Sequence, residues 1–192
     1  MGIKYLRKVM GIKGMDLSLT RISAEILEHH PDLSDIVLIG IHRRGVPLAR
    51  FLQEKIEAAS GVNIPLGRLD ITFYRDDLSM VASQPVVGTS HLDFDITGKV
   101  VLLVDDVLNT GRTTRAALES VMDYGRPRRV ELAVLVDRGH RELPIQADYI
   151  GRSVETAEEE LIEVRVNSVD GEEGVFLTTR KLLQAPESET SL

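Results

Sequence analysis

The fold is decided by residues 101–114, which read VLLVDDVLNTGRTT. The four aliphatic residues at the start of this run are typical of a parallel strand that is buried on both faces. Two acids, Asp105 and Asp106, come next, and a loop of small residues then opens a helix. The run therefore predicts a strand, a polar turn and a helix, and in α/β sheets such turns lie at the edge where ligands bind.

The small-residue loop predicts a site for an anion. Residues 110–114 bring hydroxyl and backbone N–H groups to the start of a helix, where the helix dipole amounts to roughly half a positive charge. Asp105 and Asp106 lie too close to that anion to be its ligands, but their carboxylates can accept hydrogen bonds from sugar hydroxyls. A diol beside a phosphate indicates ribose 5-phosphate.

Two plainer interpretations of the same run stay open. Thr113 could simply cap a helix while Asp105 and Asp106 end a strand, or the acid pair could bind Mg²⁺ as in a receiver-type domain. A single pair of aspartates would favour these interpretations. The unbroken order of aliphatic residues, two acids and Thr-Gly-Arg-Thr favours the phosphate site instead.

The remaining elements follow from the spacing of apolar residues. Four-residue spacing predicts helices, whereas alternation or a continuous aliphatic run predicts strands. The expected helices cover residues 19–28, 48–56 and 113–124, and the expected strands cover residues 36–39, 69–74, 100–104 and 130–136. Residues 162–166 and 175–177 should form a hairpin around Asp170 and Gly171. We therefore expect an α/β domain with a mainly parallel sheet and a small antiparallel appendage.

Composition limits the class of protein. The chain has 192 residues, 43% of them hydrophobic, which suits one domain with a packed core. It lacks cysteine and any apolar run long enough to cross a membrane, and we expect a cytoplasmic protein. The net charge of −7 argues against indiscriminate binding to nucleic acid, although arginines cluster between residues 126 and 152.

Domain boundaries follow from the same patterns. We expect a single domain over residues 1–183, with a tail at residues 184–192 that is polar and disordered. Residues 75–95 lack any periodicity, and a stretch of that length in a compact domain is more often a functional lid than a connector. Residues 137–180 are expected to form a hood over one side of the domain.

At residues 101–114 the sequence resembles the type I phosphoribosyltransferases. Three further stretches, residues 70–78, 125–127 and 132–145, resemble one branch of them, the bifunctional PyrR regulators of pyrimidine operons. The similarity runs from about Leu19 to Val166. It implies the type I phosphoribosyltransferase fold, with a mainly parallel central sheet flanked by helices, a small antiparallel hood and a flexible hairpin loop.

The resemblance also implies a function and its partners. The reaction would be uracil plus phosphoribosyl diphosphate (PRPP) giving UMP and pyrophosphate, with Mg²⁺ held mainly by substrate and water rather than by protein ligands. A uridine nucleotide, UMP or UTP, would promote binding to the leader mRNA of the pyrimidine operon, and the chain would form a homodimer or a larger homo-oligomer. Two alternatives stay open, a UMP-sensing RNA-binding regulator with little catalysis and a transferase for another nucleobase.

By resemblance, each part of the site can be assigned to numbered residues. The catalytic residues would be Asp105, Asp106 and Arg138. The 5′-phosphate would bind against Val107, Leu108, Asn109, Thr110, Gly111, Arg112, Thr113 and Thr114. The pyrophosphate would contact Arg43, Arg44 and Gly45, in a turn that often contains a non-proline cis peptide, and also Arg75, which lies outside that turn. The base would lie near Val136, Asp137 and Arg138, and RNA would contact Thr20, Arg21, Arg141 and Arg152.

Several of these side chains also have simpler interpretations. Arg75 could form only a surface ion pair with Asp76 or Asp77, and Asp137 could pair only with Arg138. His42, just before the pyrophosphate turn, is expected to be an exposed loop imidazole without a catalytic part.

The sequence departs from the family pattern mainly on the RNA side. Gln146 stands where arginine is common, Asp16 and Leu17 replace residues that are often basic, and Ala157, Glu158 and Glu159 replace a segment usually rich in serine and lysine. Because affinity for RNA grows with the number of phosphates neutralised, these changes predict weaker RNA binding. Within the site, Arg43 replaces the usual threonine and Asn109 replaces a frequent tyrosine.

Overall fold

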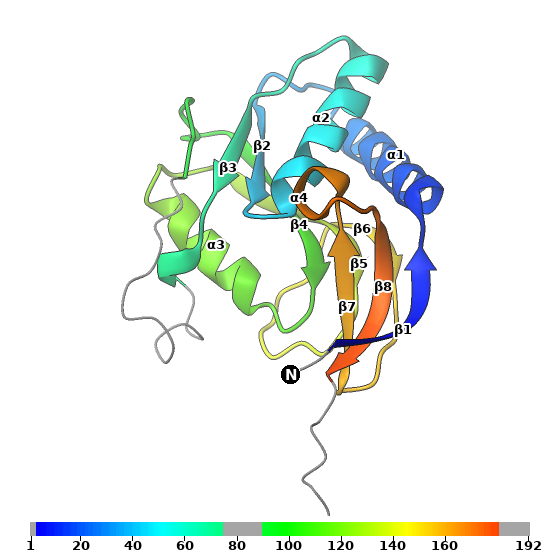
Figure 1. Ribbon diagram of the computed structural model, residues 1–192. Helices are drawn as coiled ribbons and strands as arrows, with labels where there is room; N and C mark the ends of the chain where they lie inside the picture. Colours follow the sequence, from blue (N-terminus) through cyan, green and yellow to red (C-terminus); the bar gives the residue numbers. More distant parts are fainter. Residues whose placement is uncertain (1–2, 75–89, 181–192) are drawn as a thin grey trace, which may run out of the picture.

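The centre of the protein is a five-stranded parallel sheet in the order β3-β2-β4-β5-β6. The computed structural model describes residues 3–74 and 90–180 (Figure 1). The strands are β2 (Ile36–Ile41), β3 (Leu66–Leu69), β4 (Val100–Leu108), β5 (Arg129–Asp137) and β6 (Tyr149–Ser153). The strand predicted from the aliphatic run at residues 100–104 is β4, and it lies in the middle of the sheet.

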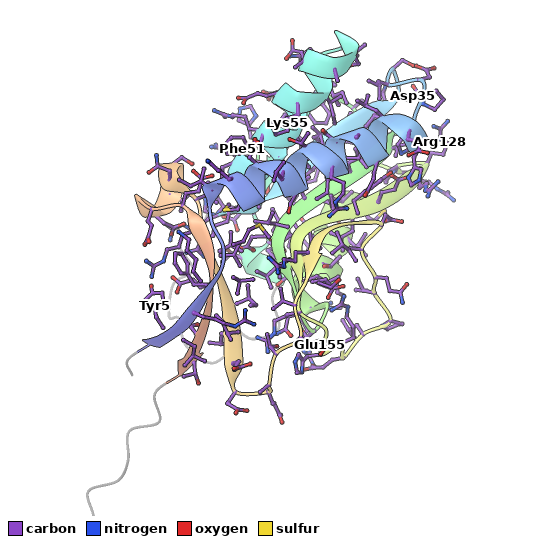
Figure 2. The ribbon with its side chains drawn as sticks, turned by 90° about the vertical axis from the view of Figure 1, so that its right-hand side faces the viewer. Tyr5, Asp35, Phe51, Lys55, Arg128 and Glu155 are labelled. Carbon is purple, nitrogen blue, oxygen red and sulfur yellow. The ribbon has the colours of Figure 1, made fainter. Side chains whose placement is uncertain are left out.

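Helices cover both faces of this sheet. The helices α1 (Ile12–His29) and α2 (Gly45–Ser60) share one hydrophobic core with Leu38 and Leu102, whereas α3 (Arg112–Met122) shares another with Ile39 and Leu103. Neighbouring residues of a strand point to opposite faces, so an unbroken aliphatic run supplies both cores. Figure 2 shows α1 crossing one face of the sheet. No helix within residues 3–74 and 90–180 is long and apolar enough to cross a membrane.

A second, antiparallel sheet forms the hood. Its strands are β1 (Ile3–Met10), β7 (Glu160–Arg165) and β8 (Gly174–Arg180), in the order β1-β8-β7, and the short helix α4 (Asn167–Asp170) connects β7 to β8. Val164 and Val175 join the core that α1 and α2 form with the main sheet. The hood therefore combines the two ends of the described chain, while β6, from within the predicted 137–180 hood, belongs to the main sheet.

Residues 69–74 do not form the predicted strand. The strand β3 ends at Leu69, and residues Thr72–Tyr74 form a short 3₁₀ helix, η1. The Asp70 carboxylate accepts hydrogen bonds from the Thr72 backbone N–H (2.8 Å) and hydroxyl (2.5 Å). Such a local side-chain bond competes with strand pairing and starts a turn, which explains why the alternating pattern was misleading here.

Candidate functional site

The acid pair lies inside β4 and not in a loop beyond it. The strand continues to Leu108, which pairs with Asp137 of β5. The Asp105 side chain is buried and accepts a hydrogen bond from the backbone N–H of Asp106 (2.9 Å). The Asp106 carboxylate in turn accepts one from the N–H of Val107 (3.0 Å). The two carboxylates are therefore held by the strand itself, at the carboxyl edge of the sheet where the sequence placed them.

Asp106 carries its charge in an unfavourable environment. Burial raises the pKa of its carboxyl, and this effect exceeds the opposing ones of a hydrogen bond with Asp105 and of the nearby Arg44 guanidinium. A carboxylate in such a place gains from any donor or positive charge that a ligand brings. The pair is thus suited to receive hydroxyl groups or a developing cation.

The turn after β2 lies against the acid pair. The peptide bond between His42 and Arg43 is cis, as the resemblance implied for this turn. Gly45, at the start of α2, is buried, and a Cβ on it would lie 2.3 Å from the carbonyl oxygen of Val104 and 3.3 Å from the Cα of Asp105. Only glycine allows this approach, which brings the turn and the amino end of α2 next to the carboxylates.

The two arginines of the turn differ in their contacts. Arg44 donates two hydrogen bonds to the Asp170 carboxylate of α4, from Nε (3.0 Å) and from a terminal nitrogen (2.8 Å). These bonds raise the pKa of Arg44 and join the turn to the hood. Arg43, by contrast, is exposed beside the acid pair. Of these two arginines, Arg43 is therefore the more available to contact a pyrophosphate.

A cavity of about 360 Å³ brings most of the predicted groups together. Six of its lining residues belong to the predicted site: Arg43, Arg44, Asp105, Asp106, Val107 and Thr113. The wall is completed by four residues without a predicted role, Ile41, His42, Ile71 and Thr72. His42 is exposed, as expected. Thr72 could have been found from its position two residues after Asp70, because this spacing is typical of a turn that ends a strand.

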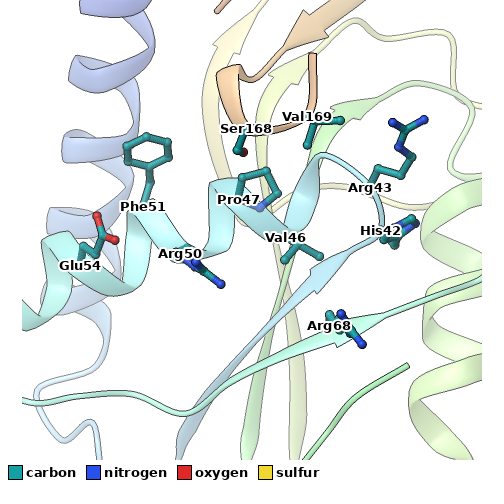
Figure 3. A pocket seen from close by; sticks show the side chains of 10 residues that line it. All are labelled: His42, Arg43, Val46, Pro47, Arg50, Phe51, Glu54, Arg68, Ser168 and Val169. Atoms are coloured by element: carbon teal, nitrogen blue, oxygen red, sulfur yellow. The ribbon is translucent and has the colours of Figure 1, made fainter. Parts of the chain in front are cut away.

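A second cavity of about 450 Å³ lies beside the turn (Figure 3). His42 and Arg43 line both cavities. The remaining wall comes mainly from α2, with Val46, Pro47 and Phe51. The sequence had no pattern that pointed to this cavity, because its walls meet only when α2 and α4 fold together.

The phosphate loop is short and left-handed at its glycine. Gly111 has a φ of +90° and precedes the first residue of α3, a conformation that favours glycine over other residues. The Thr110 hydroxyl accepts a hydrogen bond from the N–H of Arg112 (3.3 Å). The Arg112 side chain is turned to Glu142 (2.7 Å). Leu108 and Thr114, also predicted for this loop, are buried.

The three residues predicted for the base lie outside the lining of the 360 Å³ cavity. The Val136 side chain is fully buried in the core, so only its backbone could contact a ligand. Asp137 pairs with Arg141 (2.5 Å) rather than with Arg138. Arg138 is buried, its Nε has no hydrogen-bond partner among the described residues, and burial lowers the pKa of its guanidinium.

The residues predicted for RNA fall into two places. Arg21 of α1 donates to the carbonyls of Ile150 (2.8 Å) and Gly151 (2.6 Å), so it lies beside β6, the strand that carries Arg152. Thr20 is its exposed neighbour on α1. Arg141 is in the loop after β5, with contacts of its own that are described below. Arg75 and most of the predicted lid lie outside the described residues.

Comparison with known proteins gives the family. The phosphoribosyl transferase domain model matches residues 12–168. A relative from Caldicellulosiruptor bescii, named bifunctional protein PyrR, is 52% identical over 175 residues, which cover 91% of this chain and 96% of the relative. Another of that name, from Clostridium acetobutylicum, is 54% identical over 168 residues, covering 88% and 94%. The chain belongs to the PyrR family of phosphoribosyltransferases.

Solved structures support the fold independently of close sequence similarity. A hypoxanthine phosphoribosyltransferase from Trypanosoma cruzi superposes with a TM-score of 0.71 at 18% identity, covering 92% of this chain and 96% of that one. A hypoxanthine-guanine phosphoribosyltransferase from Bacillus anthracis gives 0.67 at 16%, covering 93% and 100%. Both the PyrR resemblance and the predicted type I phosphoribosyltransferase fold are therefore confirmed.

Proposed function

We propose that the chain transfers the phosphoribosyl group of PRPP to uracil, giving UMP and pyrophosphate, and that its nucleotide-bound form binds the leader mRNA of pyrimidine operons. The observation that carries the enzymatic part is the 360 Å³ cavity, in which the acid pair, the cis-peptide turn and Thr113 of α3 share one wall. Membership of the PyrR family supports uracil as the base and RNA as the second ligand.

The acid pair would bind the ribose. Asp105 and Asp106 accept hydrogen bonds from the 2′- and 3′-hydroxyls, and their negative charge favours the positive charge that builds on the ribose ring as the bond to pyrophosphate breaks. The N1 nitrogen of uracil forms the new bond at the same carbon, and its proton passes to water or to the departing pyrophosphate. The reaction needs no nucleophilic side chain, so catalysis rests on orientation and electrostatics.

The two phosphate-bearing ends of PRPP would bind at two helix starts. The 5′-phosphate binds at α3, where Thr110, Gly111 and Thr113 offer hydroxyls and N–H groups. The pyrophosphate binds at the turn before α2, where Arg43 supplies positive charge. Arg44, bonded to Asp170, fixes the turn.

Mg²⁺ would accompany the pyrophosphate. In residues 3–74 and 90–180 no three His, Asp or Glu side chains come close enough to hold a metal ion. Mg²⁺ fits such a site, because it keeps several waters and binds through substrate oxygens with few carboxylates. Bound there, it would neutralise charge on the departing pyrophosphate. Asp105 and Asp106 are the acceptors in the cavity for waters of its hydration shell.

Incubation with PRPP, Mg²⁺ and one nucleobase at a time tests the enzymatic part. We expect pyrophosphate release and UMP formation with uracil, and at most trace products with hypoxanthine or guanine. Formation of IMP or GMP at a comparable rate would contradict uracil as the substrate.

The regulatory part concerns the surface with Thr20, Arg21 and Arg152. Two acidic residues, Glu158 and Glu159, are near β6 in sequence and exposed, which should weaken RNA binding there. Titration of a labelled operon leader with and without UMP tests this part. We expect tighter binding with UMP, and the absence of any UMP-dependent change would leave an enzyme without the RNA role.

A further inference from the structure

Arg141 makes an unusual number of internal contacts for a surface loop residue. Its guanidinium donates to the backbone carbonyls of Asn109 (2.8 Å), Gly139 (2.9 Å) and Ile145 (2.9 Å), and to the carboxylate of Asp137 (2.5 Å). Its side chain is only 22% exposed. One side chain thus joins the phosphate loop, the end of β5 and the segment that follows β5.

The backbone around Arg141 supports the same loop. The N–H groups of Glu142 and Leu143 both donate to the carbonyl of Thr110 (3.0 and 3.2 Å). A Cβ on Gly111 would lie 3.4 Å from side-chain atoms of Leu143 and Ile145. Residues 138–145 therefore form the back wall of the phosphate loop, and Arg141 connects that wall to the loop by its side chain.

Arginine suits this position for a geometric reason. Its planar guanidinium presents five N–H donors in a fixed fork, so it can serve three carbonyls and one carboxylate at once. The Asp137 carboxylate compensates the positive charge of the Arg141 guanidinium. A lysine has the same charge but only three donors on one nitrogen, so it could not serve all four acceptors together.

We propose that Arg141 is a positioning residue for the 5′-phosphate. It holds the carbonyl of Asn109 against the end of β5, so that the N–H and hydroxyl groups at the start of α3 are already oriented when the phosphate arrives. Orientation before binding reduces the entropy lost on binding. The proposal rests on the proposed function, since it concerns the same phosphate site.

This role differs from the RNA contact that the resemblance implied for Arg141. Four of the five N–H donors of this guanidinium already bond inside the protein, so an RNA phosphate could take only the remaining one unless these bonds break. If Arg141 acts inside the protein, its loss weakens RNA binding only through weaker UMP binding. If it contacts RNA, its loss removes one neutralised phosphate and lowers the salt dependence of RNA binding even when UMP is saturating.

The test compares Arg141→Lys and Arg141→Gln with Arg128→Gln. Arg128 is an exposed arginine at the opposite, amino-terminal edge of the sheet, near Asp35 (3.8 Å; Figure 2). For both Arg141 variants we expect the KM for PRPP and the Kd for UMP and for ribose 5-phosphate to rise roughly tenfold, as for loss of a hydrogen bond to a charged donor. The kcat and the KM for uracil should change much less. Arg128→Gln should match wild type.

Several outcomes would overturn the proposal. One is an unchanged Kd for ribose 5-phosphate in a folded Arg141→Gln protein. A second is full rescue by lysine, because charge alone would then suffice. A third is a reduced salt slope of leader binding at saturating UMP, of the kind expected for Arg152→Gln, which would make Arg141 an RNA contact. If Arg141→Gln fails to fold, as judged by thermal unfolding, the lysine variant decides.

The ribose 5-phosphate measurement separates this proposal from the proposed function. A wild-type protein that binds ribose 5-phosphate but makes no UMP would refute the transferase activity and leave the role of Arg141 testable.

Discussion

The partly buried Asp106 carboxylate lowers the stability of the folded protein and supplies the charge that the proposed reaction needs. Burial raises the pKa of its carboxyl in the folded protein, so the protonated form is the one that folding favours. Stability from this group is therefore present below the pKa of the unfolded chain, about 3.9, and is lost as the pH rises through the higher folded value. At neutral pH the ionised carboxylate opposes folding, while its charge is what the proposed reaction requires.

Replacing Asp106 with Asn should separate these two effects. We expect the free energy of unfolding at pH 7 to stay the same or rise, because the amide carries no charge but keeps an oxygen for the N–H of Val107. The kcat should fall by roughly 10²–10³-fold, as for loss of other groups that stabilise transition-state charge. Urea unfolding and initial rates with uracil measure both. A stable variant of near wild-type activity would refute the role of Asp106.

At the scale of elements, the site depends on how closely α2 approaches β4. This approach takes place at Gly45, where the carbonyl of Val104 leaves no room for a side chain. The contact sets the distance between the pyrophosphate turn and the acid pair. It involves backbone on both sides, so the neighbours cannot yield by changing a rotamer.

Gly45→Ala should therefore displace the turn from the acid strand. We expect a loss of stability of about 2 kcal/mol, which is within the usual range for overpacking. The value of kcat/KM for PRPP should fall by a factor that corresponds to a larger free energy than this loss. Gly61→Ala is not a matched control, since Gly61 has a φ of +73°. A better control is Ala58→Gly, on an exposed face of the same helix, which should cost about 1 kcal/mol and leave kcat/KM unchanged. Equal kinetic effects in both variants would contradict the argument.

The sequence predicted those elements whose pattern is local. Helices α1, α2 and α3 and strands β2, β4 and β5 were visible because each has its own apolar period or aliphatic run. Strand β1 was missed because what stabilises it is pairing with β8, at the other end of the described chain. Strand β6 was missed because it has only five residues, too few to show a period.

The residues of the candidate site also fall into two groups, those that the sequence predicts and those whose contacts only the structure shows. Asp105, Asp106 and Thr113 could be found because their motif is continuous in sequence, and Arg43 because of the family resemblance. The bond of Arg44 to Asp170 and the bond of Arg141 to the carbonyl of Asn109 join segments that are far apart in the sequence. The spacing of residues in a sequence does not indicate where the end of a long, flexible side chain lies. The partners of Arg44 and Arg141 could therefore be identified only from the structure.

For the molecule as a whole, the carboxyl and amino edges of the parallel sheet have different functions. The carboxyl edge carries the site, whereas the amino edge holds a buried polar cluster that ties α1 to the sheet. There the Glu131 carboxylate accepts hydrogen bonds from Tyr149 (2.8 Å) and pairs with His30 (2.9 Å). Burial opposes the charge of Glu131, but the bonds to His30 and Tyr149 outweigh it, and the pKa of Glu131 is lowered.

Glu131→Gln should accordingly destabilise the protein in a pH-dependent manner. A lowered folded pKa gives stability that is present above the unfolded value, about 4.3, and lost as the pH falls through the folded value. We expect a loss of about 2–4 kcal/mol at pH 7 that shrinks toward zero below about pH 4. Urea unfolding from pH 3 to 8 measures this.

The matched control is Glu119→Gln, which breaks an exposed ion pair with Arg115 and should lose less than about 0.5 kcal/mol at any pH. A difference between Glu131→Gln and wild type that did not vary with pH would show that packing, and not the charge of Glu131, matters at this edge.

The central claim is that the cavity at the carboxyl edge binds a phosphorylated ribose, and a crystal structure with UMP tests it most directly. The account predicts the phosphate within hydrogen-bonding distance of the N–H groups of residues 110–114, with the ribose hydroxyls donating to Asp105 and Asp106. UMP bound elsewhere, with those groups free of ligand, would contradict it.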